Sequence, residues 1–373
     1  MPSRVHDAFW KRALLSLPFV PLFIWPSVDE EASAALMVPY LLKMVEDGFW
    51  SSSNGEITLS MDERHLHMPW LDKAMNPLIA VFSPSMTGID PVGRLQMISF
   101  LADMAPLFVV GVLEKSRRHH HWSALIYPIL FAVASQILGI GKLAGAHFLV
   151  EYFWSPSTKL ATAESALIPR RAVNSLFAAM LLVYYPLLAA CYFAPAVEAR
   201  IQANAVWQLF PILVPLVQAV FFRLGGDTNG KSASPAADTT RVEDIRSVRL
   251  AIGTLCTLST LTFLYVRFSR PQDTSMLEIF LPFDYGTPMD SLETAARRFL
   301  QWDHIGWIAP AYYWLLLSFR DLALRGGVEI PWVQVLLALG LGTVSFGAGA
   351  TFGLVWLWRE SMLSRSFGGV KRD

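Results

Sequence analysis

Charged residues are scarce in this sequence of 373 residues. Asp, Glu, Lys and Arg make up 16% of the chain and hydrophobic residues 54%, whereas a soluble domain typically carries about 25% charged residues. The 30 basic and 30 acidic residues balance, so no basic face is indicated and no nucleic-acid partner is expected. Together with several apolar runs of nearly membrane-spanning length, this composition predicts a polytopic membrane protein.

Cysteines and the usual enzyme motifs are also few. Cys191 and Cys256 are the only two cysteines, and both lie in apolar segments, so we expect buried side chains without a disulfide. The chain has no Walker-type glycine loop, HExxH or GxSxG, and it lacks the DDxxD and DxDD strings of terpene synthases. Three adjacent histidines, residues 119–121, point in different directions from one loop and do not predict a metal site.

Apolar segments are abundant, and they predict an all-α transmembrane helix bundle of eight or nine spans. Eight runs have nearly spanning length, and residues 141–154 would add a ninth if that short segment crosses. The eight runs are 13–28, 93–114, 123–140, 172–193, 204–222, 250–266, 304–319 and 333–358. The basic loops between them do not agree on one side of the membrane, so the orientation is not predicted.

The remaining segments are more polar. Residues 29–92 are expected to form an interfacial cap, and residues 268–303 to include an amphipathic helix lying along the membrane surface. Residues 225–244 are rich in Gly, Ser, Asp and Thr and predict a flexible polar loop, because such a segment cannot bury a core. We expect this loop to lie within a single transmembrane domain, residues 1–373.

An acid in the middle of an apolar run is the strongest functional signal. Asp103 lies near the centre of residues 93–114, and Pro106 follows three positions later. A charged side chain at that depth costs about 2.5–3.5 kcal/mol, so it is normally protonated, paired or turned toward a protein interior. Proline removes a backbone donor and kinks the helix beside the acid. Asp103 is therefore predicted to be a proton donor or, equally, a structural hydrogen-bond acceptor.

Further polar residues give additional candidates. Glu151 lies one helical turn after His147 in an apolar segment, so the two share a face that is expected to point inward. Asp303 precedes a predicted span, where capping a helix N-terminus competes with a catalytic role. Gln136 and Gln208 would either orient a substrate or form an interhelical hydrogen bond.

Seven stretches, taken in order along the chain, resemble a fungal family of membrane-bound terpene cyclases from meroterpenoid clusters, which includes the ascochlorin and ascofuranone cyclases. The stretches are PWLDK (69–73), APLFVVGVLEKSRR (105–118), SQILGIG (135–141), SP (155–156), NAVWQLFP (204–211), FLQWDHIG (299–306) and FGAGATFGLVWLWRE (346–360). The resemblance implies an isomerase-type cyclase that acts on a prenylated aromatic or polyketide substrate, often one with a terminal epoxide.

That reaction agrees with the chemistry of the candidate residues. A carboxylic acid in a low-dielectric site stays neutral near pH 7 and can protonate an epoxide or olefin. Aromatic faces then stabilise the carbocation. The candidate acids are Asp103, Glu151 and Asp303; the candidate substrate-binding residues are Gln136, His147, Tyr152, Trp154, Trp207, Gln208, Trp302 and Tyr313.

The expected setting follows from this chemistry. We expect no metal or organic cofactor, a hydrophobic isoprenoid or prenylated polyketide as substrate, and a multi-pass location in the bilayer of the endoplasmic reticulum. The competing interpretation is an exporter of a hydrophobic metabolite, although the symmetric halves with broken helices that are common in transporters are not visible in the sequence. A non-catalytic scaffold is a third reading.

Overall fold

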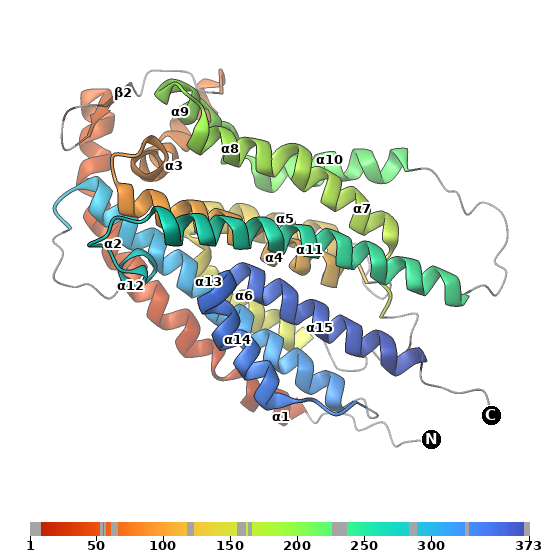
Figure 1. The fold of residues 1–373 in the computed structure, drawn as a ribbon. Helices are drawn as coiled ribbons and strands as arrows, with labels where there is room; N and C mark the ends of the chain where they lie inside the picture. The colour runs from red at the N-terminus through yellow and green to blue at the C-terminus, as the bar shows by residue number, and fades with distance from the viewer. Residues whose placement is uncertain are drawn as a thin grey trace, which may run out of the picture.

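Long helices build the fold, and the described part of the chain is all-α apart from one short hairpin (Figure 1). The computed structural model describes residues 9–52, 55, 57–60, 66–117, 123–154, 162, 166–225, 237–282, 289–324 and 328–368. The helices are α1 (Phe9–Ser16), α2 (Phe19–Asp47), α3 (Pro69–Thr87), α4 (Pro91–Lys115), α5 (Ser123–Leu138), α6 (Ile140–Trp154), α7 (Arg170–Ala179), the π-helix η2 (Met180–Tyr184), α8 (Tyr185–Phe193), α9 (Val197–Trp207), α10 (Phe210–Leu224), α11 (Ala237–Ser269), α12 (Met276–Phe280), α13 (Leu292–Leu324), α14 (Trp332–Phe346) and α15 (Ala348–Gly368). Strands β1 (Phe49–Ser51) and β2 (Thr58–Ser60) pair antiparallel.

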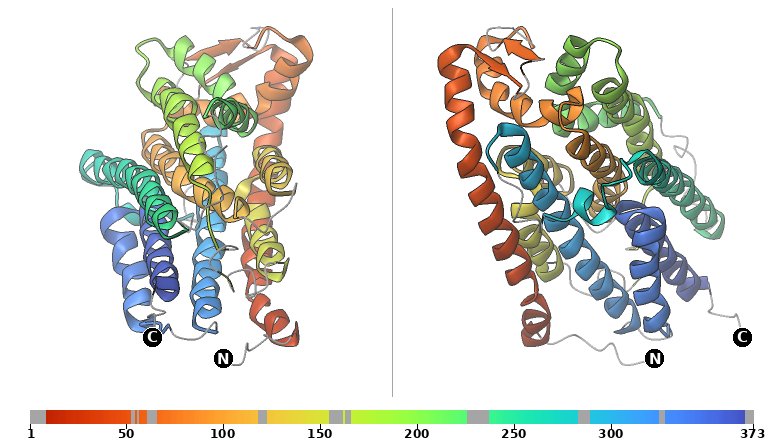
Figure 2. Two further views of the ribbon diagram at one scale, coloured as in Figure 1. Left: turned by 90° about the vertical axis from the view of Figure 1, so that its right-hand side faces the viewer. Right: turned by 60° about the vertical axis from the view of Figure 1, so that its left-hand side comes forward.

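Most of the long helices run in similar directions and pack in layers. In Figure 1, α7, α8 and α10 form the upper layer, α4, α5 and α11 lie below them, and α13, α6 and α15 follow. Both views of Figure 2 show α2 running the length of the molecule at its edge, and it packs against α6 and α13. The helix with the central acid, α4, is the most enclosed of the candidate spans, as 89% of its apolar window is buried.

Three predicted boundaries are wrong. The first span does not end at residue 28, because α2 continues to Asp47 and Glu30 is buried against its neighbours. The expected surface helix within 268–303 is instead the start of α13, whose Ala295, Ala296 and Leu300 are buried. The run 333–358 is two helices, since Gly347 has a φ of +89° and breaks it between α14 and α15.

Two further predictions need correction or stay open. The run 204–222 is the bent pair α9 and α10, which meet at 68°, and Pro211 lies in the first turn of α10, where proline is favoured. Residues 226–236 of the predicted loop lie outside the described residues, and α11 already begins at Ala237. The flexibility of this loop, the single domain and the histidines at 119–121, which also lie outside the described residues, stay predictions.

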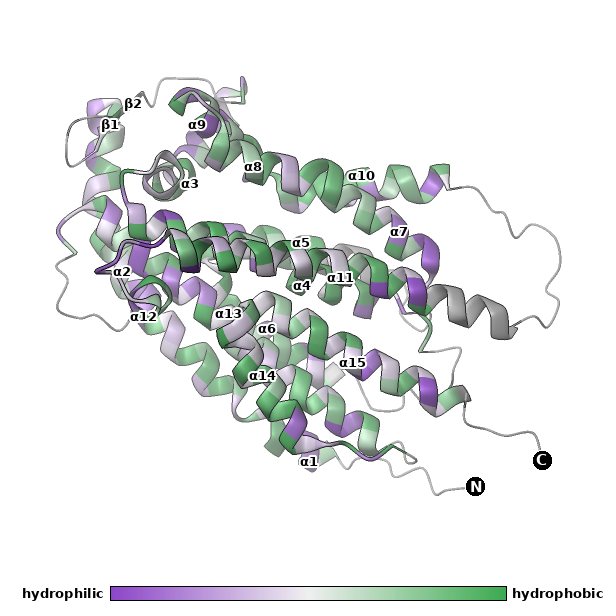
Figure 3. Ribbon diagram, viewed as in Figure 1, coloured by the Kyte–Doolittle hydropathy of each residue, from purple (hydrophilic) through white to green (hydrophobic). Residues whose placement is uncertain are grey.

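Apolar side chains cover much of the outer surface. Among the described residues, three helices are long and apolar enough to cross a membrane, namely α4, the continuous α7–η2–α8 helix and residues 245–269 of α11, and the bent α9–α10 pair would make a fourth. Helices α10, α11 and α14 carry exposed leucines, valines and phenylalanines, as expected for surfaces that face lipid, and Figure 3 shows long hydrophobic stretches on these helices. The described residues thus confirm apolar candidate spans, while the count of eight or nine stays a prediction.

Glycines let three helices approach closely. A Cβ atom added to Gly306 of α13 would lie 2.6 Å from the Cα of Gly141 in α6, and one added to Gly145 would lie 2.8 Å from the backbone of Phe23 in α2. Real Cβ atoms are essentially never found so close to another atom, so only glycine fits at these positions. The contacts fix the start of α6 against α13.

We expect Gly306→Ala to lower the free energy of unfolding by about 1–3 kcal/mol, the usual cost of overpacking. The added methyl group would push α6 away from α13, since the atoms it meets belong to backbone. Gly253→Ala in α11 is the matched control, because nothing lies within 4 Å of its added Cβ and alanine favours a helix. Denaturant unfolding in detergent micelles measures both variants; equal stability of the two would contradict the expectation.

Candidate active site

Asp103 lies in a tight junction between helices. Its side chain is buried, Ser259 of α11 donates a hydrogen bond of 2.5 Å to its Oδ1, and Nε2 of His304 lies 3.2 Å from its Oδ2. On α15, a Cβ added to Gly349 would lie 2.5 Å from the Cα of Asp103. Asp103 does not line the cavity described next, so its hydrogen-bond partners hold it outside that cavity.

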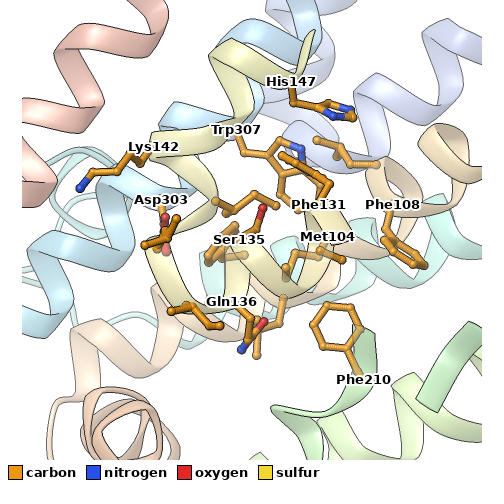
Figure 4. Close-up of a pocket in the computed structure, with 18 of the residues that line it drawn as sticks. Met104, Phe108, Phe131, Ser135, Gln136, Lys142, His147, Phe210, Asp303 and Trp307 are labelled. Atoms are coloured by element: carbon orange, nitrogen blue, oxygen red, sulfur yellow. The ribbon is translucent and has the colours of Figure 1, made fainter. Parts of the chain in front are cut away.

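A cavity of about 330 Å³ opens on the other side of α4. Its walls come from α2, α3, α4, α5, α6, α9, α10, α13 and α15, and most lining side chains are aliphatic or aromatic. In Figure 4, Lys142 and Asp303 lie at one end, Phe108 and Phe210 at the other, and Gln136 along one side. Such a space, apolar with few polar groups, is typical of a site for a hydrophobic small molecule.

Asp303 is the acid at one end of this cavity. It lies in the interior of α13, is 5% exposed, and its Oδ1 accepts a hydrogen bond of 2.8 Å from the backbone N–H of Gly141. Asp303 therefore does cap a helix, as predicted, but not the predicted one. It accepts a hydrogen bond from the first turn of α6 and does not lie at the start of its own helix, α13. Phe299 and Trp307, one turn before and after it on the same face, also line the cavity.

A second carboxyl stands beside Asp303, and the sequence analysis did not single it out. Glu30 of α2 is fully buried; its carboxyl interacts with the backbone N–H of Lys142 and with the carboxyl of Asp303, although neither makes a hydrogen bond of good geometry with it. A Cβ added to Gly139 would lie 2.8 Å from Glu30 Oε2 and 3.0 Å from Asp303 Oδ1, so both oxygens border the same point. Two carboxyls this close in a buried site cannot both be ionised.

Burial acts on both carboxyls in the same direction. Loss of solvent, and then the negative charge of Asp303, raise the pKa of Glu30. Loss of solvent also raises the pKa of Asp303, while the N–H groups of Gly141 and Ile140 lower it. Both residues lie outside the helices that qualify as candidate spans. The proton of the pair is therefore held more firmly by Glu30 than by Asp303.

Glu151 lines the cavity but is already paired. Lys115, the last residue of α4, forms a salt bridge with it, and both side chains are largely buried. His147, one turn earlier on α6, also lines the cavity and stacks on Phe131, with ring centroids 4.0 Å apart. A Glu151 paired with a lysine is poorly suited to donate a proton.

The predicted substrate-binding residues divide into two groups. Gln136, His147 and Trp207 line the cavity. Gln208 does not, but it accepts a hydrogen bond from Gln136, as the interhelical alternative predicted. The other described candidates face different neighbours: the guanidinium of Arg12 lies over the Tyr152 ring, Trp302 packs on Trp25, and the Tyr313 hydroxyl donates to Leu15 O. The Trp154 side chain lies outside the described residues.

Sequence reasoning missed two residues that line the cavity and one that lies next to it. Phe299 and Trp307 could have been found from their spacing of four residues from Asp303. Glu30 carried no such signal, because it sits in the run Asp29, Glu30, Glu31, which has the pattern of a solvated turn. Both cysteines are buried and free, as predicted, and no cluster of three His, Cys, Asp or Glu side chains suited to a metal occurs among the described residues.

Comparisons with known proteins bear on this site. Residues 43–364 match the family described as the CtvD domain. The chain is 26% identical to the terpene cyclase ctvD of Aspergillus terreus over 318 residues, which are 78% of this chain and 83% of that protein, and 22% identical to the terpene cyclase ascI of Acremonium egyptiacum over 70% of this chain and 67% of that protein. It is also 24% identical to the FAD-dependent monooxygenase anuJ of Penicillium roqueforti, over 99% of this chain but only 43% of that protein. No solved structure matches.

Proposed function

Because this chain belongs to the CtvD domain family, we propose that it is a membrane-bound terpene cyclase of fungal secondary metabolism. Terpene cyclases with which it shares most of its length support a cyclase role. The proposed substrate is a prenylated aromatic or polyketide with a terminal epoxide or olefin, and the proposed product is its cyclic isomer. The finer parts of the proposal are eight or nine spans and a location in the endoplasmic reticulum.

One observation carries the proposal: an apolar, aromatic cavity with a carboxyl at one end. Protonated Asp303 gives its proton to the epoxide oxygen or to the terminal olefin carbon, and a carbocation forms as the epoxide C–O bond breaks or the new C–H bond appears. An internal C=C bond attacks the cation and closes the ring. Loss of a proton to Asp303 completes an isomerisation, so the mass of the substrate does not change.

Aromatic rings line the cavity in which the cation would form and migrate. Phe299 and Trp307 flank Asp303 on α13, while Trp207 and Phe210, whose ring centroids lie 5.0 Å apart, line a further part of the cavity. Ring faces attract cations through their quadrupole and, in a desolvated site, stabilise them by about 2 kcal/mol each. An apolar wall also excludes water, which would otherwise trap the cation as an alcohol.

Among the three candidate acids, access and partners favour Asp303. Asp103 is enclosed by Ser259, His304 and the backbone of α15, and Glu151 is bound to Lys115. We do not propose a monooxygenase activity for this chain, because it spans only 43% of the length of the monooxygenase relative.

Product analysis tests the function directly. Microsomes containing the protein are incubated with a farnesylated phenol and with its terminal epoxide, and products are identified by mass spectrometry and NMR. We expect an isomer of unchanged mass, made also by Asp103→Asn at a rate within about tenfold of wild type, since that acid lies outside the cavity. Loss of the isomer in a well-folded Asp103→Asn would move the proton donor to Asp103. Absence of turnover by wild type would overturn the cyclase proposal and favour transport.

A further inference from the structure

Glu30 is a fully buried carboxyl whose two oxygens make no hydrogen bond of good geometry with the described residues, although the backbone N–H of Lys142 and the Asp303 carboxyl lie beside it. An ionised carboxylate in that position would be desolvated and only weakly compensated, so such a group takes up a proton instead. Asp303, its neighbour, does have donors, because the backbone of α6 supplies an N–H group at 2.8 Å. The protein therefore stabilises the ionised form of Asp303 more than the ionised form of Glu30.

The geometry gives the two acids different access as well. Asp303 lines the cavity, whereas Glu30 does not and lies behind the turn at Gly139 and Gly141 (Figure 4 shows Asp303 and Lys142 at this end). Gly139 has a φ of +90°, which admits glycine and strains other residues, and its missing side chain leaves room for both carboxyls. The break between α5 and α6 thus brings a sequestered acid next to an accessible one.

We propose that Glu30 stores the proton that Asp303 delivers to the substrate. This inference rests on the proposed function and makes Glu30 a positioning residue that acts through Asp303. In the resting pair the proton is on Glu30 and Asp303 is ionised. As substrate enters, the Glu30 O–H bond breaks and an Asp303 O–H bond forms; the Asp303 proton then passes to the substrate. The proton released on ring closure returns to the pair, so no net proton is consumed.

The other charges around Glu30 leave this arrangement intact. Lys142 of α6 is the nearest cation, and it is bound to Glu31, whose side chain is mostly exposed. On α2, Asp29 and Glu31 are its neighbours in sequence, and on α13 the facing group is Asp303. The charge of Lys142 and its backbone N–H favour the ionised form of Glu30, but burial and the charge of Asp303 act more strongly in the opposite direction, so the buried pair retains a proton.

Infrared spectroscopy and a pH profile test the proposal together. Purified protein at neutral pH is expected to show absorbance of a protonated carboxylic acid that disappears in Glu30→Gln and persists in the control Asp29→Asn. In Glu30→Gln the remaining proton must be held by Asp303 alone, whose N–H partners favour its ionised form. The alkaline limb of kcat is therefore expected to move about one pH unit lower, which is about a tenfold loss at neutral pH, recovered at lower pH with KM unchanged.

The outcomes separate this inference from the cyclase proposal. A protonated-acid signal unchanged in Glu30→Gln, or an equal loss of activity at every pH, would overturn the stored proton, since a merely structural residue would act in that way. In another outcome, wild type turns over none of the substrates while the infrared signal still depends on Glu30. In that case the cyclase proposal fails, but the proton held by Glu30 in the carboxyl pair is supported, because the spectrum does not require turnover.

Discussion

Replacing Asp303 with asparagine is expected to lower kcat by about 10²–10⁴-fold, the contribution typical of a general acid. Asparagine has the same shape and keeps a carbonyl oxygen that can accept the hydrogen bond from Gly141, so the first turn of α6 stays capped. It has no proton to deliver at neutral pH, and it cannot pass one on from Glu30. The loss should therefore appear in kcat, with little change in substrate affinity or in the amount of folded protein.

Single-turnover measurements in microsomes, with a farnesylated phenol epoxide as substrate, would check this expectation. Asp72→Asn is the matched control, because Asp72 is also a buried aspartate that accepts two backbone N–H groups, from Leu66 and Met68, but it lies away from the cavity. Turnover by Asp303→Asn at the rate of wild type would show that another group protonates the substrate.

The largest effect on stability is expected from Arg117→Met. The Arg117 side chain is 1% exposed; it binds Glu114 through two nitrogens at 2.7 and 2.8 Å, and Glu360 at 2.8 Å. Arg359 is then the cation that contacts both carboxylates, and Trp356 still donates a hydrogen bond of 2.9 Å to Glu114. Removing one member of a buried ion pair leaves an uncompensated charge and costs about 3–5 kcal/mol.

Unfolding in detergent micelles would measure this loss as a change in the free energy of unfolding. Arg249→Met is a suitable control, since Arg249 makes an exposed contact with Ser361 and surface changes of this kind are usually within about 0.5 kcal/mol. A difference below about 1 kcal/mol between the two variants would mean that the cluster at the ends of α4 and α15 does not hold these helices together.

Local patterns predicted much of the helical structure. The run around Asp103 is the helix α4, and the runs 172–193 and 250–266 lie in candidate spans. The stretches that carry the family resemblance also meet in space: SQILGIG packs on FLQWDHIG through Gly141 and Gly306. The structure of these runs was predictable because it depends on hydrophobicity and length, which are local properties of the sequence.

Properties that depend on distant segments were not predictable. Asp303 caps α6 and not its own helix because α6 approaches α13 closely. Gly141 and Gly306 permit this approach, but their presence in the sequence does not specify it. Glu30 has the sequence environment of a surface residue, and only contact with α6 and α13 makes it a buried acid. The sequence indicates Asp103 as an acid within an apolar run, yet access to the cavity, which favours Asp303 over Asp103, is a property of the packed bundle.

The position of α2 also governs the order in which the molecule can be assembled. The buried surroundings of Glu30 are completed by α13, and Arg12 of α1 binds Asp321 of α13, 309 residues further along the chain. Synthesis proceeds from the N-terminus, so α1 and α2 emerge long before their partners. Arg12 and Glu30 therefore have to wait for α13 before they reach their buried surroundings, and the pair of carboxyls can form only late in biogenesis.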